Sequence, residues 1–525
     1  MKKLLLGNEA VARGLYEAGV TFISSYPGTP STEITECAAA YDEMYAEWAP
    51  NEKVALEAAL GASVAGARSF AAMKHVGLNV AADPLFTAAY TGVNGGLVVC
   101  VADDPAMHSS QNEQDSRHYA RAAKLPMLEP SDSGECRDFT RLAYEISEAF
   151  DTPVLLRTCT RVAHAQSLVE LKPREERPLR EYKKDPAKYV MNPGYGFRRH
   201  GVVEARLKAL AEYSESSPLN FEEMGDTAVG FVCAGSVYEY VREAFPNASV
   251  FKVGMSFPMP IEKLRAFAAK VERLYLVEEL DGVMETELRA AGIRVDGGKD
   301  RFGCIGELSQ KKIEAAMGEK MPETETFDEP VPPRPPVMCA GCPHRGVFFT
   351  LNKLKLTVLG DIGCYTLGAS EPLSAIDTTV CMGASVSMLH GFLKTRPENA
   401  VKTVAVIGDS TFLHSGVTGL INIAYNRSVS TVLILDNSIT GMTGHQQNPA
   451  TGLTLKLEAV PPVSLEKLCE AVGIRRVRVV DPGDLKALET ALREETAADE
   501  PSVIICRKPC MLLKYVKPKK PLAVD

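Results

Sequence analysis

The segments VAVIGDSTFLHSG (residues 404–416) and TVLILDNSITGMTG (residues 431–444) carry the strongest fold signal in the chain. Each begins with an apolar run, Val404–Ile407 and Thr431–Leu435, that predicts a buried strand. A helical pattern of apolar residues separates the two runs, so together they predict a strand–helix–strand unit. Polar residues follow both strands, and α/β folds bind ligands at the carboxyl ends of their parallel strands. The sequence therefore predicts an α/β fold with a ligand site at this edge.

The polar residues at the two strand ends suit a phosphate and a divalent cation. Gly408 lets the backbone approach closely, Asp409 offers a carboxylate oxygen, and Asn437 offers an amide oxygen. Mg²⁺ takes a few such ligands and fills its remaining positions with phosphate oxygens and water. The alternative is an ordinary strand–helix–strand unit with a polar loop.

This arrangement resembles the thiamine diphosphate motif, in which Gly-Asp-Gly at one strand end is followed by Asn at a second. Here Ser410 replaces the third residue, and the second half reads Asp-Asn-Ser. The resemblance implies that Mg²⁺ binds Asp409, Asn437 and the carbonyl oxygen of Ile439. The residues implied for thiamine diphosphate at this edge are Gly408, Asp409, Ser410, Asn437, Ile439, Gly441, Met442 and Thr443.

Composition argues against several other classes of protein. The 525 residues predict three or four domains, and the 45% of hydrophobic residues suffice for several cores. The net charge of −9 disfavours a nucleic-acid or anionic-membrane surface. Glu9 and Arg13 interrupt the apolar start of the chain, and no run approaches the roughly 18 apolar residues of a membrane-spanning helix. We expect a cytoplasmic protein whose 13 cysteines form no disulfide framework.

Three doubly wound α/β units are expected along the chain, and the third carries the opening motif. The predicted segments are a first unit at 1–165, a charged and irregular connector at 166–220, a second unit at 221–319, an acidic and Pro-rich linker at 320–337, a third unit at 338–515 and a tail at 516–525. The first and third units are of similar size, as two halves of one site would be.

A thiamine enzyme also needs one glutamate in an apolar setting. The cofactor's own 4′-imino group removes the C2 proton, and a carboxylate against N1′ makes that tautomer available. In ferredoxin-linked 2-oxoacid oxidoreductases this glutamate precedes glycines nine and fourteen residues later. Glu52 matches both spacings through Gly61 and Gly66, whereas Glu57 matches one. Glu52 is therefore the expected cofactor carboxylate, Glu57 is the second choice, and a solvated helix glutamate is the alternative for either.

Seven segments together resemble the large, thiamine-binding subunit of indolepyruvate ferredoxin oxidoreductases, within the 2-oxoacid:ferredoxin oxidoreductase family. They are SSYPGTPSTE (24–33), NEKVALEAALGASVAG (51–66), MKHVGLNVAADP (73–84), VADDPAMHSSQNEQDSR (101–117), CAGCPHRG (339–346), GDIGCYTLG (360–368) and GDSTFLHSG (408–416). The resemblance implies that the three units are pyrimidine-binding, transketolase C-terminal-like and diphosphate-binding domains. It implies oxidative decarboxylation of arylpyruvates, such as indolepyruvate and phenylpyruvate, to aryl-acetyl-CoA, with coenzyme A as co-substrate and electrons passed singly to ferredoxin.

The resemblance also implies partners and leaves two alternatives open. A small (beta) subunit and a hetero-oligomer built on a dimer are expected. The family's large subunit continues into a ferredoxin-like domain where this sequence ends in KPKKPLAVD, so either that domain is truncated or electrons leave through another partner. A non-oxidative thiamine-dependent 2-oxoacid decarboxylase would use Glu52, Asp409 and Asn437 without an iron–sulfur cluster. A non-catalytic thiamine-binding scaffold is the second alternative.

Loops of the first unit are implied to meet the substrate. Thr29 lies where relatives hold the carboxylate or keto oxygen of the 2-oxoacid. His108 and Arg117 follow a predicted strand, and a cation such as Arg117 suits a carboxylate. Lys74 and His75 could also face the substrate. The alternative for each residue is a polar surface loop with local hydrogen bonds.

Four cysteines form a candidate metal site in the third unit. Cys339 and Cys342 form a Cys-x-x-Cys pair, Cys364 follows a predicted strand, and Cys510 lies in a late Lys-Pro-Cys. In related 2-oxoacid:ferredoxin oxidoreductases, cysteines in this order hold a [4Fe–4S] cluster, which needs four thiolates. Zinc and buried free thiols are the rival interpretations, and Cys506 is the alternative fourth ligand.

Overall fold

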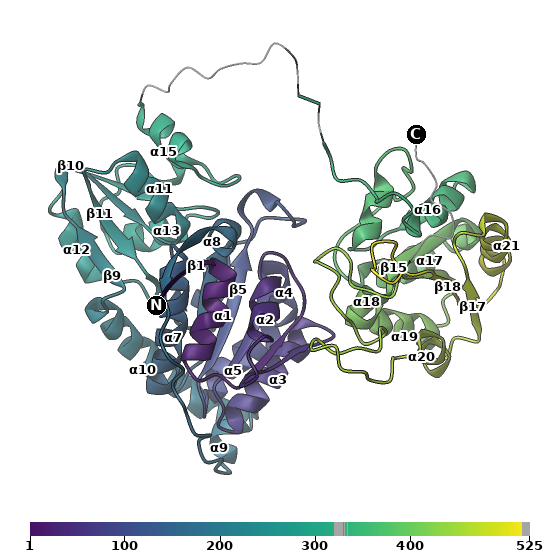
Figure 1. Ribbon diagram of the computed structural model, residues 1–525, viewed down its shortest axis with the longest axis horizontal. Coiled ribbons are helices and arrows are strands. Elements are labelled where there is room, and N and C mark those ends of the chain that lie inside the picture. Colours follow the sequence, from purple (N-terminus) through teal and green to yellow (C-terminus); the bar gives the residue numbers. More distant parts are fainter. Residues whose placement is uncertain (320–328, 330, 333, 517–525) are drawn as a thin grey trace. The chain divides into compact units, whose positions relative to one another are not determined.

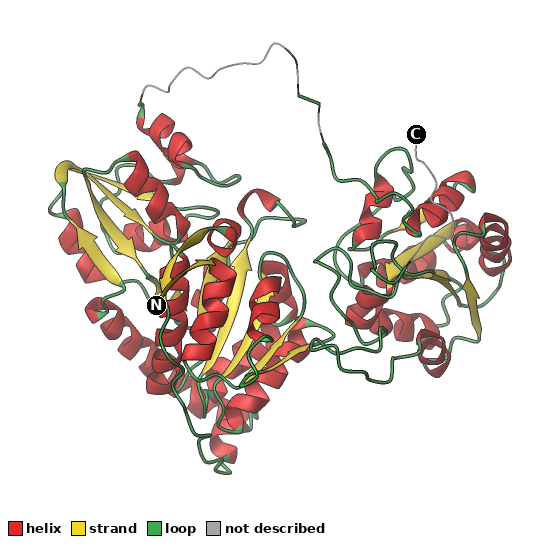
Figure 2. Cartoon of the chain, viewed as in Figure 1, coloured by secondary structure: helices red, strands yellow, loops and turns green. Residues whose placement is uncertain are grey.

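Mainly parallel β-sheets flanked by helices form the framework of the chain in the computed structural model (Figures 1 and 2). The structure describes residues 1–319, 329, 331–332 and 334–516. Most of the predicted Pro-rich stretch from 320 and all but one residue of the predicted tail lie outside these residues. The chain divides into two compact units, Met1–Thr326 and Phe327–Asp525. The predicted α/β class is confirmed in both units.

A seven-stranded sheet with the order β12-β6-β7-β5-β4-β2-β3 dominates the first unit. Its strands are β2 (Phe22–Ser25), β3 (Tyr45–Trp48), β4 (Ser69–Lys74), β5 (Leu97–Asp103), β6 (Met127–Leu128), β7 (Val154–Cys159) and β12 (Met255–Phe257). Only β12 runs antiparallel to its neighbour. β4, β5 and β7 are buried along their whole length, which explains their near-continuous apolar sequences.

Helices cover both faces of this sheet. One face carries α1 (Gly7–Glu17), α2 (Thr32–Ala38) and α7 (Ser133–Phe150), and the other carries α3 (Glu52–Val64), α4 (His75–Val80), α5 (Ala82–Thr91) and α6 (Arg117–Ala123). α3 begins at Glu52 because the Asn51 side chain accepts a hydrogen bond from the N–H of Val54 at 2.9 Å. This N-cap fixes Glu52 in the first turn of the helix.

A second sheet, with the order β13-β10-β11-β9, completes the first unit. Its strands are β9 (Asn220–Glu223), β10 (Asp226–Cys233), β11 (Ala248–Val253) and β13 (Arg273–Val277). The helices α11 (Ser236–Ala244) and α15 (Gln310–Met317) pack on one face, and α12 (Ile261–Ala268) and α13 (Val283–Ala290) pack on the other. Because β12 pairs with β6, the chain returns to the larger sheet after β11. The predicted domain boundaries within this unit stay predictions.

The predicted irregular connector contains regular structure. β8 (Gln166–Glu170) pairs antiparallel with β1 (Lys2–Leu6), and α10 (Pro193–Ser216) is a long helix capped by Asn192. The prediction of an irregular segment is wrong for these stretches. α10 gives a weak helical signal because few of its residues are buried, namely Val203, Arg206, Leu210 and Ser214. The first unit also has the short helices α8 (Thr160–His164), α9 (Pro186–Tyr189) and α14 (Lys299–Phe302).

A five-stranded parallel sheet with the order β14-β15-β16-β18-β17 forms the centre of the second unit. Its strands are β14 (Thr357–Leu359), β15 (Thr403–Gly408), β16 (Thr431–Asp436), β17 (Arg476–Val480) and β18 (Ser502–Arg507). One face packs against α16 (His344–Lys353) and α21 (Leu485–Thr496), and the other against α17 (Ala384–Thr395), α19 (Val417–Tyr425) and α20 (Leu465–Ala471). β15 and β16 confirm the two strands predicted from the opening segments. Within the described residues, no helix has the length and apolar character needed to span a membrane.

Candidate functional site

The loops that follow four neighbouring strands gather at the carboxyl edge of the second unit's sheet. β14 leads into residues 360–364, β15 into Asp409, β16 into Asn437, and β18 into residues 508–510. The parallel register of the strands aligns these ends. The structure therefore brings the predicted magnesium ligands and two of the predicted cysteines to one edge, where α/β sheets bind ligands.

The three groups expected to bind magnesium lie in contact with one another. Asp409 begins the short helix α18 (Asp409–Thr411) and is 2% exposed. The side-chain amide nitrogen of Asn437 donates to Asp409 Oδ1 at 3.2 Å and to the carbonyl oxygen of Ile439 at 2.7 Å. The three groups predicted as magnesium ligands are therefore in direct contact, and the Asn437 amide would turn its oxygen toward a bound cation. A carboxylate, an amide and a carbonyl oxygen form a donor set that fits a hard cation such as Mg²⁺.

The electrostatics of Asp409 agree with a cation site. Burial and the neighbouring Asp436 carboxylate raise the pKa of Asp409 to about 7. Asn448 donates to Asp409 Oδ2 at 3.3 Å, and the hydroxyl of Thr440 donates to Ser410 Oγ at 2.9 Å. A bound cation would favour the ionised form of this buried carboxyl. No motif in the sequence identified Asn448, because its contact with Asp409 depends on the path of the loop after β16.

Gly408 has a structural reason in addition to the predicted one. A Cβ at this position would lie 2.6 Å from the ring of Tyr365, so only glycine fits. The hydroxyl of Tyr365 donates to the carbonyl of Ile362 at 2.7 Å and fixes the ring. After α18 the helix continues through a π-type turn, Phe412–Gly416, a distortion that is frequent at functional sites.

The loop predicted to hold the diphosphate is organised by its own contacts. The hydroxyl of Thr443 donates to Gln446 Oε1 at 2.6 Å. Met442 is 52% exposed. A Cβ on Gly441 would lie 3.4 Å from the sulfur of Cys364, so this loop runs beside the candidate cysteine site. The cofactor roles of Gly441, Met442 and Thr443 stay predictions.

The four predicted cluster cysteines lie in one neighbourhood of the second unit. Burial raises the pKa of Cys364 to about 11, and the nearby thiols of Cys342, Cys510 and Cys339 add to this effect. The N–H of Cys342 donates to the carbonyl of Cys339 at 3.1 Å. Across the described ranges, no three His, Cys, Asp or Glu side chains are already arranged to hold a metal ion.

The structure distinguishes the two candidates for the fourth cysteine. Cys506 belongs to β18 and is buried in the hydrophobic core of the second unit. Cys510 lies beyond the strand: its N–H donates to the carbonyl of Asn437 at 3.0 Å, and its Sγ lies 3.9 Å from Nε2 of His445. The position at the carboxyl edge favours Cys510.

The first unit holds the predicted cofactor carboxylate, Glu52, which is 4% exposed. A Cβ on Gly77 would lie 2.5 Å from Glu52 Oε1, so the carboxylate lies directly against the backbone of α4. Glu57 lies on the exposed face of α3 and pairs with Lys53. Burial therefore favours Glu52 over Glu57, and the cofactor role itself stays a prediction.

The loops after β2 and β5 meet at the carboxyl edge of the seven-stranded sheet. Ser109 Oγ donates to the carbonyl of Thr29 at 3.2 Å, and Lys74 Nζ, from the end of β4, donates to the carbonyl of Ser109 at 2.8 Å. His108 is directed elsewhere, because its Nε2 lies 3.1 Å from Glu307 Oε2 on the unit's surface. The structure thus brings Thr29 together with Lys74 rather than with His108.

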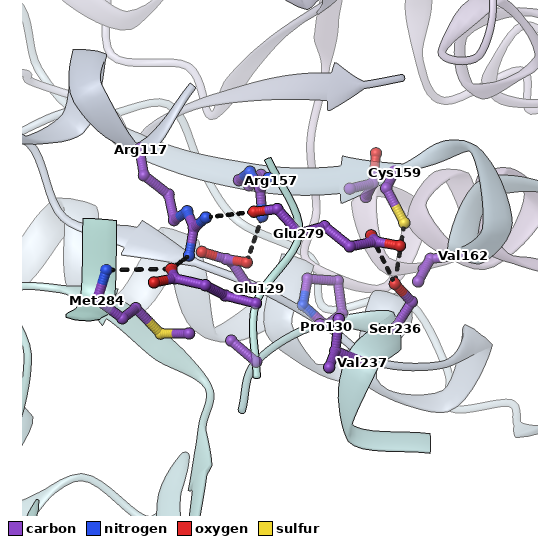
Figure 3. Close-up of a pocket in the computed structure, with 14 residues that line it drawn as sticks. Arg117, Glu129, Pro130, Arg157, Cys159, Val162, Ser236, Val237, Glu279 and Met284 are labelled. Atoms are coloured by element: carbon purple, nitrogen blue, oxygen red, sulfur yellow. Dashed lines mark hydrogen bonds and ion pairs between the residues drawn. The ribbon is translucent and has the colours of Figure 1, made fainter. Parts of the chain in front are cut away.

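The guanidinium of Arg117 forms ion pairs and hydrogen bonds with other residues of the first unit (Figure 3). It is 2% exposed, and it donates to Asp115 Oδ2 at 2.6 Å and to Glu278 Oε2 at 2.5 Å. Arg157 lines the same small cavity and pairs with Glu129 at 2.6 Å. Because carboxylates of the chain already neutralise the guanidinium, the structure does not support the predicted pairing of Arg117 with a substrate carboxylate. Its contact with Glu278 instead joins the two sheets of the first unit.

Two family models match the chain. One is described as pyruvate flavodoxin/ferredoxin oxidoreductase, thiamine diP-bdg, and matches residues 13–213. The other is described as thiamine pyrophosphate enzyme, C-terminal TPP binding domain, and matches residues 361–506. The first match includes Glu52, and the second includes Asp409 and Asn437.

Similar proteins are found along almost the entire chain. The indolepyruvate oxidoreductase subunit IorA of Archaeoglobus fulgidus is 40% identical over 98% of this chain and 87% of its own length. The subunit IorA of Pyrococcus abyssi is 41% identical over 97% of this chain and 86% of its own length. Among solved structures, a 2-oxoglutarate:ferredoxin oxidoreductase from Magnetococcus marinus is 17% identical, with a TM-score of 0.48, 60% of this chain covered and 65% of that chain covered.

Proposed function

Because the chain belongs to the family of the indolepyruvate oxidoreductase subunit IorA, we propose that it catalyses the oxidative decarboxylation of arylpyruvates. The broader class follows from family membership: the chain is a thiamine diphosphate-dependent 2-oxoacid oxidoreductase. The proposal adds indolepyruvate and phenylpyruvate as substrates, aryl-acetyl-CoA as product and ferredoxin as electron acceptor. It also adds a small partner subunit, which the word subunit in the relatives' names supports.

The observation that carries the proposal is the direct contact of the Asn437 side chain with Asp409 and with the carbonyl of Ile439. In this proposal Asp409, Asn437 and the carbonyl of Ile439 hold Mg²⁺, and the ion in turn holds the cofactor's diphosphate. Glu52 is the partner of the aminopyrimidine, for which its burial and its first-turn position on α3 are suitable. When bound, thiamine diphosphate would supply a carbon nucleophile and a cationic ring that takes up the electron pair left by loss of CO₂.

We further propose that Cys339, Cys342, Cys364 and Cys510 hold a [4Fe–4S] cluster. Their mutual proximity and their position beside the loop after β16 support the assignment. A cluster would supply a one-electron acceptor, which an oxidative enzyme needs and a simple decarboxylase does not. Zinc and free thiols are the other outcomes of an iron and sulfide analysis.

A panel of substrates tests the proposal. The chain is purified with its small subunit without oxygen, loaded with thiamine diphosphate and Mg²⁺, and given coenzyme A and a one-electron acceptor. We expect kcat/KM to be higher for indolepyruvate and phenylpyruvate than for pyruvate and 2-oxoglutarate, with aryl-acetyl-CoA as the product. A preference for 2-oxoglutarate would refute the aromatic assignment while leaving the broader class intact.

A further inference from the structure

Lys74 is a buried lysine at the ligand-binding edge of the first unit. It is the last residue of β4 and is 9% exposed. The other residues of β4 are buried too, and Lys74 is the one charged residue of the strand, located at the carboxyl edge of the sheet. Lysine is rarely buried to this extent without a partner, because removing an ammonium from water is costly.

The ammonium group has unused hydrogen-bonding capacity. Nζ donates to the carbonyl of Ser109 at 2.8 Å. An ammonium has three donors, and no other acceptor or ion-pair partner is found for Nζ in the part of the chain that the structure describes. The carboxylates of Asp104 and Glu52 act on it only at longer range. Burial lowers the pKa of Lys74 to about 8, so it is mainly charged at neutral pH.

The surroundings of Lys74 include the groups assigned to substrate and cofactor. The side-chain stem lies on Gly28, where a Cβ would be 3.3 Å from Lys74 Cγ. Ser109, which accepts from Nζ, donates to the carbonyl of Thr29 at 3.2 Å. The helix α4 begins directly after Lys74, and its Gly77 is the residue against which Glu52 packs. Lys74 therefore lies between the substrate loop and the cofactor carboxylate.

We propose that Lys74 binds the carboxylate of the 2-oxoacid substrate. The inference rests on the proposed function, since it assumes a 2-oxoacid at this edge. A 2-oxoacid enters with a carboxylate that needs a cation, and Arg117, the cation suggested by the sequence, is already paired with Asp115 and Glu278. Lys74 has the charge, the free donors and the position that Arg117 lacks.

Paired ligands test this assignment directly. Indole-3-propionate and indole-3-propionamide have closely similar shapes but differ in charge, and neither can be decarboxylated in this reaction. We expect the cofactor-loaded wild-type complex to bind the acid about 10- to 100-fold more tightly than the amide in calorimetric titrations, as for a charge-assisted hydrogen bond. Lys74→Gln, which keeps a donor for the carbonyl of Ser109, should bind the two ligands equally, and Lys74→Arg should restore part of the preference.

The control is Lys124→Gln, because Lys124 pairs with Glu204 at the surface of the same unit. This variant should keep the wild-type preference for the acid. The inference is overturned if Lys74→Gln also keeps that preference, or if the wild type has none. If Lys74→Gln does not fold, Lys74→Met replaces it in the same comparison. If the wild type does not turn over arylpyruvates, the proposed function is wrong. If the wild type turns them over but Lys74→Gln keeps the preference for the acid over the amide, this inference alone is refuted.

Discussion

Replacing Gly77 by alanine is a sharp test of the position assigned to Glu52. The new Cβ would lie 2.5 Å from Oε1, 2.7 Å from Cγ and 2.8 Å from Cδ of Glu52, whereas ordinary van der Waals contact begins at 3.4 Å. The carboxylate must therefore move by about 1 Å, and a displacement of this size costs roughly 100-fold in rate. Overpacking of a buried site also lowers the free energy of unfolding by about 1–3 kcal/mol.

Gly61→Ala provides the matched control, since a Cβ on Gly61 meets nothing within 4 Å. This change on α3 should raise the stability by about 0.5–1 kcal/mol, because alanine is the better helix former. The assays are arylpyruvate turnover and thermal unfolding of the complex. Trp48, the one tryptophan of the chain, ends β3 shortly before Glu52, so we expect its fluorescence to change when the cofactor binds. Wild-type turnover by Gly77→Ala would show that the position of Glu52 is irrelevant to catalysis.

Four other changes give separable outcomes. Glu52→Gln should still bind thiamine diphosphate but lose exchange of its C2 proton, and normal exchange measured by NMR would count against the assigned role. Asp409→Ala should weaken Mg²⁺-dependent cofactor binding by more than about 100-fold, since even outer-shell metal partners contribute 10- to 100-fold; unchanged affinity in a titration would remove Asp409 from the ligand set. Cys364→Ser should lower iron and acid-labile sulfide per chain, and wild-type iron content would exclude Cys364 as a ligand. The preference for indole-3-propionate over indole-3-propionamide should be constant below about pH 7 and fall as the pH rises through about 8. The reason is that Lys74, which faces Glu52 and Asp104, then loses its proton. A preference independent of pH up to 10 would contradict the Lys74 ammonium as the binding group.

The central strands were predictable from the sequence for a simple physical reason. Parallel strands covered on both faces need continuous apolar residues, and β15 and β16 have them. The long helix α10 was not predictable, because it buries few residues and its interior positions include Arg206. A helix that packs by a narrow stripe leaves little periodic signal in its sequence.

The same contrast applies to the candidate site. Asp409, Asn437 and Ile439 lie at two adjacent strand ends, so a local motif suffices to bring them together. Arg117 pairs with Asp115, only two residues earlier, and also with Glu278, which directly follows β13 of the other sheet. No local pattern could reveal the contact with Glu278. Gly77 and Asn448 escaped prediction for a related reason, since each contributes through a contact between distant segments.

The division of products between oxidation and aldehyde release tests the central claim most directly. The complex loaded with thiamine diphosphate and Mg²⁺ is mixed with indolepyruvate and coenzyme A without oxygen, in the presence of ferredoxin. We expect two reduced ferredoxins and one indole-acetyl-CoA for each CO₂ released, with no free aldehyde. Release of CO₂ with one equivalent of indole-acetaldehyde and no reduced ferredoxin would contradict the central claim and identify a non-oxidative decarboxylase.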